Sequence, residues 1–268
     1  MNPKHLFKTA LITGLTVAGL AGPALSAPSV DEIVKKTNEA SYYQGEDGRA
    51  AVKMTITDAQ GRTRSRAFTV MRRDEADGGE QKFYIYFSAP ADVARMAFIV
   101  HKHLDRDDDR WLYLPAMDLV KRIAASDKRT SFVGSDFFYE DVSGRRLADD
   151  EHTLVKDSGP YYVLKHTPKD KGSVEFDHYV MYVHKKTFLP TKVEYFDSKG
   201  ALYRTMTVNA VKTVQGHPTV TKATMEDLRA KTKTVLEYSD VAYDLGLPDR
   251  VFKERSLRRA PRKYLGGQ

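Results

Sequence analysis

Residues 161–208 read YYVLKHTPKDKGSVEFDHYVMYVHKKTFLPTKVEYFDSKGALYRTMTV and determine the fold class. Apolar and aromatic side chains recur at short intervals in four segments, 161–166, 174–184, 190–196 and 202–208, which we predict to be strands. Turn-forming sequence such as Asp197-Ser198-Lys199-Gly200 separates them. Short strands at this spacing, with no helical pattern between them, predict an antiparallel meander.

The same pattern continues on both sides of this stretch. Further predicted strands are residues 52–57, 62–71, 82–87, 96–104, a short aromatic run from Trp111 to Pro115, 218–225 and 232–238. Segment 82–87 has aromatic residues on both faces, which is typical of a strand covered on both sides. The fold class is therefore mainly β (α+β). We expect one domain, residues 27–268, in which the antiparallel meander either closes into a barrel or forms a single strongly curled sheet.

One helix is predicted ahead of the strands, from Ser29 to Ser41. Ser29 is a favourable N-cap and Glu32 follows three residues later, which is the capping-box arrangement. Val30, Ile33, Val34 and Thr37 recur at helical spacing and give one apolar stripe. We expect this stripe to pack on the sheet or close one end of a barrel.

The N-terminus indicates export. Lys4 and Lys8 precede an uncharged, apolar run from Thr9 to Gly22, and small residues follow up to Ser26 and Ala27. This is typical of a secretory signal peptide, which we assign to residues 1–26 with cleavage after Ser26 or Ala27. The sequence contains no cysteine, so the protein has neither disulfides nor an acylated N-terminal cysteine.

The segment 111–141, WLYLPAMDLVKRIAASDKRTSFVGSDFFYED, has the composition of a hydrophobic flap bounded by charges. A basic turn is expected at Lys121 and Arg122, and an apolar cluster follows it. The residues predicted to contact lipid or form a lid are Trp111, Tyr113, Phe132, Val133, Phe137, Phe138 and Tyr139. A sheet with an apolar face and a movable cover is suited to holding a hydrophobic ligand, although an ordinary β core explains the same aromatic pattern.

Catalytic motifs are not evident. Gly134-Ser135-Asp136 lacks the flanking glycines of a nucleophile elbow, and Ser135 is better suited to cap a short helix over 136–141. His101 and His103 share a strand face near Asp107, but a metal site needs three or four convergent ligands, so we favour a polar strand end. We therefore predict no enzyme activity, no metal and no cofactor.

The charge is mildly basic. Loss of Lys4 and Lys8 with the signal peptide reduces the net charge from +7 to +5. This charge suits either a solvated surface or an acidic or lipid partner. Aromatic residues between basic ones also suit nucleic acid, which export argues against. The arginine-rich C-terminal run 255–263 is predicted to be a frayed tail.

Three further segments carry a family resemblance together with 111–141. They are FSAPADVARMAFIV (87–100), FLPTKVEYFDSKG (188–200) and KTVLEYSDVAYDLGLPDRVFKERSLRR (233–259). With them, nearly the whole mature chain resembles the bacterial outer membrane lipoprotein-sorting family of LolA-like proteins. The resemblance implies a single curled sheet in the form of an unclosed β-barrel, with short covering helices and a hydrophobic cavity for acyl chains. It also implies a periplasmic carrier role without enzymatic chemistry. Some relatives work beside transporters of the resistance–nodulation–division (RND) type.

Two functional hypotheses follow. The first is a monomeric periplasmic carrier that binds the acyl chains of lipoproteins or other lipids and moves them towards the outer membrane. The second is a non-enzymatic adaptor of an inner-membrane RND-type lipid exporter, with Lys121, Arg122, Lys128 and Arg129 contacting the partner. A lipid or glycan hydrolase is a third reading that lacks any convincing acid–base pair.

Overall fold

The computed structural model of the chain describes residues 27–76 and 78–266. The predicted signal peptide, residues 1–26, lies outside the described residues. Within them, no helix has the length and apolar character needed to cross a lipid bilayer.

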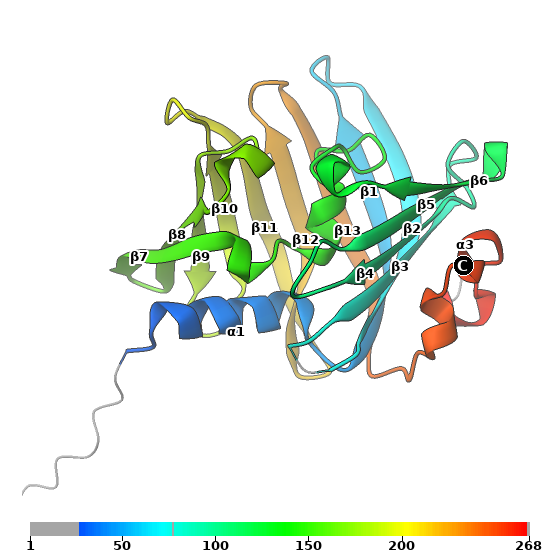
Figure 1. Ribbon diagram of the computed structural model, residues 1–268, viewed down its shortest axis with the longest axis horizontal. Helices are drawn as coiled ribbons and strands as arrows, with labels where there is room; N and C mark the ends of the chain where they lie inside the picture. Colours follow the sequence, from blue (N-terminus) through cyan, green and yellow to red (C-terminus); the bar gives the residue numbers. More distant parts are fainter. Residues whose placement is uncertain (1–26, 77, 267–268) are drawn as a thin grey trace, which may run out of the picture.

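In this part of the chain, thirteen strands form one antiparallel sheet (Figure 1). The strands are β1 (Asp47–Thr57), β2 (Thr63–Asp74), β3 (Gln81–Ala89), β4 (Ala97–Lys102), β5 (Asp109–Leu114), β6 (Leu119–Ile123), β7 (Asp150–Ser158), β8 (Tyr161–Pro168), β9 (His178–His184), β10 (Pro190–Phe196), β11 (Leu202–Val214), β12 (His217–Asp227) and β13 (Thr232–Tyr243). The helices are α1 (Val30–Tyr42), α2 (Tyr139–Ser143) and α3 (Arg255–Arg258), with 3-10 turns η1 (Pro115–Met117), η2 (Ala125–Asp127), η3 (Leu147–Asp149), η4 (Lys171–Ser173), η5 (Asp249–Phe252) and η6 (Arg262–Tyr264).

The strand order explains why the barrel does not close. The order is β6-β5-β4-β3-β2-β1-β13-β12-β11-β10-β9-β8-β7, so β6 and β7 follow each other in the chain but lie at opposite edges. Residues 124–149, which we call the cover, connect these two edges. The predicted single curled, unclosed antiparallel sheet with short helices is confirmed.

Two hairpin turns show how local sequence sets the strand pairing. In Asp58-Ala59-Gln60-Gly61, the Asp58 carboxylate accepts from the backbone N–H groups of Gln60 and Arg62, at 3.0 and 2.9 Å. In 197–200, Asp197 accepts from Lys199 and Ala201 in the same way, at 2.9 Å each. Both turns place glycine at positive φ, +79° and +77°, where a Cβ is unfavourable.

Helix α1 forms as the sequence predicts. The Ser29 hydroxyl accepts from the backbone N–H of Glu32 at 3.2 Å and caps the helix. The buried side chains are Ile33, Val34 and Thr37, which belong to the predicted apolar stripe. The two aliphatic residues pack with Leu164 of β8 and Val183 of β9, so α1 covers the β7–β9 end of the sheet (Figure 1).

The two faces of the sheet carry separate hydrophobic cores. Alternation along β3 places Phe83, Ile85 and Phe87 in the core of the concave face, under the cover. It places Tyr84, which is fully buried, in the core of the convex face. The prediction that this strand is covered on both sides is confirmed.

The convex core is completed by the C-terminal segment, residues 245–266. Its buried side chains, Leu247, Val251, Phe252, Leu257 and Leu265, pack on Met71, Tyr84, Ala97 and Ile99. Figure 1 shows α3 on the outer side of strands β2–β5. The prediction of a frayed C-terminal tail is wrong, because apolar residues between the arginines give this segment a face that the sheet buries.

Candidate functional site

A cavity of about 470 Å³ lies between the concave face, α1 and the cover. Its apolar lining comes mainly from the second half of the sheet, with Leu164, Met181, Val193, Met206, Val208, Val220, Met225, Leu236 and Val241. Met54, Phe68, Val70, Phe83 and Ile85 contribute from the first half. A concave, mostly apolar site with a few polar groups, in the range of about 300–1,000 Å³, is typical of small-molecule pockets.

The cover fills the first half of the concave face and leaves the second half open. Phe132 and Tyr139, 3% and 8% exposed, insert from the cover. The Phe132 ring centroid lies 5.5 Å from that of Phe98 and 6.0 Å from that of Phe87. The Tyr139 ring lies 5.2 Å from Phe98. These contacts fasten the cover by hydrophobic packing, and the unfilled space lies beside them.

The predicted lid cluster thus divides by role. Phe132 and Phe137 both pack with the concave core and line the cavity, whereas Val133 and Tyr139 pack with that core and are not part of the lining. Phe138 instead lies between two arginines, with the guanidinium of Arg204 3.9 Å and that of Arg129 4.8 Å from its ring centre. Five neighbouring residues therefore serve three different functions in this structure.

Trp111 and Tyr113 lie elsewhere. Both pack in the convex core, and the Tyr113 hydroxyl donates to Asp118 at 3.1 Å. Alternation along β5 sends Leu112 and Leu114 to the concave core instead. Trp111 and Tyr113 therefore do not line the cavity, because the aromatic side chains of β5 face the C-terminal segment.

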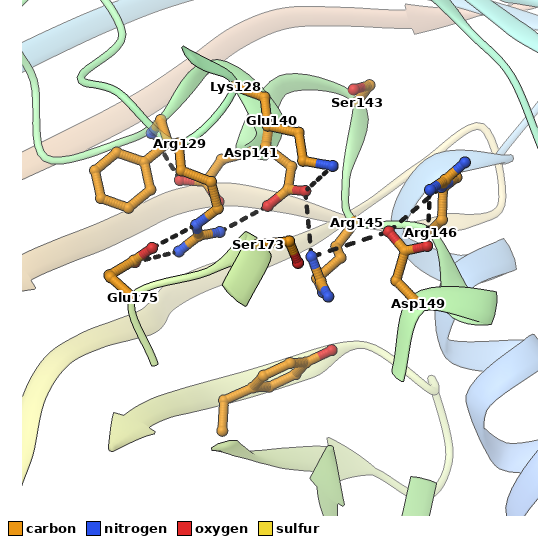
Figure 2. Close-up of polar contacts among 12 residues, drawn as sticks. Lys128, Arg129, Glu140, Asp141, Ser143, Arg145, Arg146, Asp149, Ser173 and Glu175 are labelled. Atoms are coloured by element: carbon orange, nitrogen blue, oxygen red, sulfur yellow. Dashed lines mark hydrogen bonds and ion pairs between the residues drawn. The ribbon is translucent and has the colours of Figure 1, made fainter. Parts of the chain in front are cut away.

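Buried ion pairs hold the cover on one side (Figure 2). Arg129 donates to Glu140 at 2.7 Å and forms a two-point contact with Glu175. Arg145 lies 3.5 Å from Glu140 and 2.9 Å from Asp150. Burial alone would raise the pKa of Glu175, but hydrogen bonding and charge from Arg129 lower it. The network spans the cover and the loop before β9.

Arg204 of β11 holds the centre of the cover. This residue is 1% exposed, yet it donates to the Asp141 carboxylate at 2.6 Å and to the Asp136 carbonyl at 3.0 Å. Asp136 in turn accepts from the hydroxyls of Thr232 and Thr234 on β13. The sequence analysis missed Arg204, and the only available signal was a charged residue interrupting an apolar strand.

Lys102 of β4 contacts the end of α2. Its ammonium donates to the Ser143 carbonyl at 2.8 Å and lies 5.0 Å from the ring centre of Tyr42. Burial lowers the pKa of Lys102 to about 8. The Ser143 hydroxyl also donates to Asp108, which pairs with Arg110. Polar groups from both halves of the sheet therefore converge on α2.

The four basic residues predicted to contact a partner separate into two pairs. Lys121 and Arg122 are exposed on the edge strand β6. Lys128 and Arg129 are not available, because Lys128 pairs with Asp107 at 2.8 Å and Arg129 is committed to Glu140 and Glu175. The side chains of Lys128 and Arg129 are only 12% and 9% exposed, so partner contact by these two residues stays a prediction that their present ion pairs do not favour.

The short helix begins later than predicted. It is α2, Tyr139–Ser143, instead of 136–141, because Asp136 is drawn to β13. Ser135 donates to the Phe132 carbonyl at 2.7 Å and accepts from the Phe137 N–H at 3.2 Å. It therefore stabilises the turn before the helix instead of capping it.

At the end of β4, where we predicted a polar strand end, His101 and His103 both form hydrogen bonds. His101 contacts the Phe252 carbonyl at 2.8 Å, and His103 contacts Glu80 and Asp109 at 2.8 and 3.1 Å. Among the described residues, no three histidine or acidic side chains are grouped to hold a metal ion. His101 joins β4 to the C-terminal segment, and His103, just after β4, contacts the turn before β3 and the first residue of β5.

Comparison with known proteins identifies relatives of this arrangement. A family model described as an uncharacterized protein matches residues 79–259. No curated protein matches. Among solved structures, a DUF1329 family protein from Desulfovibrio piger is 29% identical, with a TM-score of 0.77, covering 84% of this chain and 96% of its own. A LolA superfamily protein from Nitrosomonas europaea shares the fold, at 21% identity and a TM-score of 0.66, over 85% of this chain and 99% of its own.

A putative outer membrane lipoprotein-sorting protein domain from Vibrio parahaemolyticus is similar to the same extent. It is 30% identical, with a TM-score of 0.78, and the match covers 85% of this chain and 97% of that domain. The region matched by the family model, residues 79–259, contains strands β3 to β13 and the cover, whereas β1 and β2 precede it. On these matches, the chain belongs to the family of LolA-like outer membrane lipoprotein-sorting proteins.

Proposed function

We propose that the protein is a periplasmic carrier that binds acyl chains of lipoproteins or other lipids in the cavity beneath the cover. The observation that carries the proposal is the apolar space of about 470 Å³ left open on the second half of the concave face. A sheet that served only as a scaffold would be expected to fill this space with its own side chains. The signal-like residues 1–26 support export to the periplasm.

The energetics suit a carrier. Each methylene transferred from water into an apolar site contributes about 0.8 kcal/mol, so a chain of about twelve methylenes contributes on the order of 10 kcal/mol. Binding of this strength holds a chain during transit, but release then requires the site to change. The cover is the element whose displacement would open the cavity, because it connects the sheet edges across the concave face.

The test is a charge placed in the cavity wall. Phe137→Glu introduces a carboxylate on the lining, so we expect retention of a fluorescent fatty-acyl probe to fall by at least about tenfold while the far-ultraviolet circular dichroism stays unchanged. Phe196→Glu is the matched control, because Phe196 stacks on His178 away from the cavity lining. If the folded Phe137→Glu protein retained the fatty-acyl probe as well as the wild type does, the cavity would not be the site of acyl-chain binding.

The adaptor function is a second candidate, supported by the exposed edge strand β6. Lys121 and Arg122 lie on it, and its unpaired edge is open to a partner strand. Under this alternative, Lys121→Glu with Arg122→Glu abolishes capture of an RND-type transporter from envelope extracts, and no lipid copurifies with the wild type. The adaptor function would be excluded if a defined lipid copurified with the wild type and the double variant carried that lipid equally well.

A further inference from the structure

The cavity wall carries three tyrosines whose hydroxyls have no protein partner. Tyr42 of α1, Tyr195 of β10 and Tyr238 of β13 line the cavity. Within the described residues, none of these hydroxyls forms a hydrogen bond, whereas those of Tyr179 and Tyr203 donate to Asp150 and Glu175. The three side chains are partly buried, and a hydroxyl in an apolar cavity without a protein partner favours a ligand or bound water as its partner.

The three phenols belong to the cavity wall and are partly buried. Each side chain keeps some accessible surface, yet burial raises the pKa of Tyr195 and of Tyr238 to about 12. Burial is also the main cause that raises the pKa of Tyr42, followed by Asp141 and then by Tyr195 and Tyr238 themselves. The three phenols therefore line one cavity and stay neutral at physiological pH, so each can act as a hydrogen-bond donor.

Gly144 fixes the position of the Tyr42 ring against the cover. A Cβ at this glycine would lie only 2.6 to 2.8 Å from Cζ, Cε2 and the hydroxyl of Tyr42, and the residue has φ +76°. The close approach brings the hydroxyl beside the end of α2. Tyr195 reaches the same region from the sheet, since its ring centre lies 5.0 Å from the Arg204 guanidinium that binds Asp141.

The charged groups along the wall already have partners. Arg129 is bound to Glu140 and Glu175, and Arg145 lies between Glu140 and Asp150. Arg72 donates to the backbone carbonyls of Gln44 and Gly45, at 2.7 Å each. Among the described residues, the cations at or beside this wall are thus bound to carboxylates or to backbone carbonyls, as Arg49 and Lys102 are, and an anionic ligand head would also face the carboxylates of the cover.

We propose that Tyr42, Tyr195 and Tyr238 form a recognition site for a neutral hydrogen-bonding group, an ester carbonyl or a hydroxyl, at the polar end of a lipid. This inference rests on the proposed carrier function. The apolar wall takes the hydrocarbon, and the phenols distinguish an esterified or alcoholic head from a free carboxylate or phosphate. Each phenol can donate to a carbonyl oxygen or exchange hydrogen bonds with a hydroxyl.

The test compares matched ligands with the delipidated mature protein. Methyl dodecanoate, dodecanol, dodecanoate and dodecane each displace a fluorescent alkyl probe at neutral pH. Tyr42, Tyr195 and Tyr238 are changed to Phe singly and together, and Tyr113→Phe on the convex core is the control. Each cavity substitution should lower the ratio of ester affinity to alkane affinity by about two- to tenfold, with alkane affinity unchanged.

The outcomes separate this inference from the carrier function. If no ligand binds, including dodecane, the carrier function fails. If dodecane binds and the triple variant keeps the wild-type ratio, only the tyrosine site is wrong. Wild-type protein that binds dodecanoate as tightly as dodecanol would likewise contradict selection for a neutral head. A lower ratio of ester affinity to alkane affinity in the triple variant, with the wild-type ratio kept by Tyr113→Phe, supports the tyrosine site.

Discussion

His166 of β8 shows how one buried residue is held in a single protonation state. Its Nδ1 lies 2.8 Å from Nδ1 of His152, and Nε2 of His152 lies 3.0 Å from the Leu147 carbonyl, which can only accept. His152 therefore donates to that carbonyl, and a hydrogen bond joins the two rings. The His166 ring also stacks on Tyr179, with ring centres 4.5 Å apart. Burial, followed by the neighbouring His152, lowers the pKa of His166 to about 3.

This shift predicts a loss of stability in mild acid. Unfolded histidine titrates near pH 6.5, so between about pH 6.5 and pH 3 the unfolded chain binds a proton that folded His166 does not. The free energy of unfolding should therefore fall as the pH falls through this window, by at most about 1.4 kcal/mol per unit from this residue. Urea unfolding from pH 7 to about pH 4.5 measures the slope before most carboxylates titrate.

His166→Phe is the variant that isolates this contribution. It keeps a ring to stack on Tyr179 but cannot titrate, so its stability should depend less on pH. His101, whose pKa burial also lowers, leaves a residual slope in both proteins. The same slope in variant and wild type would show that His166 is protonated in the folded protein.

At the level of elements, the cover is attached to the sheet by both aromatic packing and charge. Arg204 combines the two, since it donates to Asp141 and lies against the ring of Phe138. Guanidinium groups suit this double contact because they are planar and donate in a fixed geometry. A lysine would keep the charge and lose both the stacking and part of the hydrogen bonding.

Two substitutions of Arg204 test this attachment. Arg204→Leu leaves Asp141 without its cation and should lower the free energy of unfolding by about 3 kcal/mol. Arg204→Lys should cost about 1 kcal/mol. Hydrogen exchange of residues 136–142 should accelerate in the same order. Unchanged protection of the cover in both variants would mean that hydrophobic packing alone holds it.

The C-terminal segment is predicted to be as necessary as a strand. Phe252 is fully buried, so Phe252→Ala should lower the free energy of unfolding by about 3–5 kcal/mol. Leu245→Ala is a control in the same segment, because Leu245 is 40% exposed and should cost less than about 0.5 kcal/mol. Similar midpoints of urea unfolding for both variants would show that packing of the C-terminal segment contributes little to stability.

The sequence reveals those elements whose side chains alternate between core and solvent. Eleven of the thirteen strands in the described part of the chain overlap segments chosen for that pattern. The two missed strands, β6 and β7, are the sheet edges, and most of their described side chains are exposed or only partly buried. Edge strands commonly carry charges, which blunt aggregation and also remove the alternation. The basic turn expected at Lys121 and Arg122 is therefore strand β6.

The site was harder to predict than the fold. Phe132 and Phe137 were identified because an apolar cluster in a connecting segment is unusual. Arg204 and the three cavity tyrosines were not, because their roles depend on which side chains from distant strands meet them. Trp111 was assigned to the lid from its position in the chain, whereas strand alternation places it on the other face.

For the whole molecule, the central feature is a sheet that curls but does not close. Its first half has its concave face filled by Phe132 and Tyr139 of the cover. Its second half keeps a cavity bounded by α1, so the same concave surface supplies both the stability and the binding space. The cover, which joins the two edges, is the natural place for an opening motion.

The most direct test of the carrier account is native mass spectrometry, with lipid extraction, of the mature protein purified from its own envelope without detergent. We predict one defined acylated species at close to one per protein, lost from the Phe137→Glu variant and retained by Phe196→Glu. A mass equal to the bare polypeptide, together with no binding of added acyl lipids, would contradict the account.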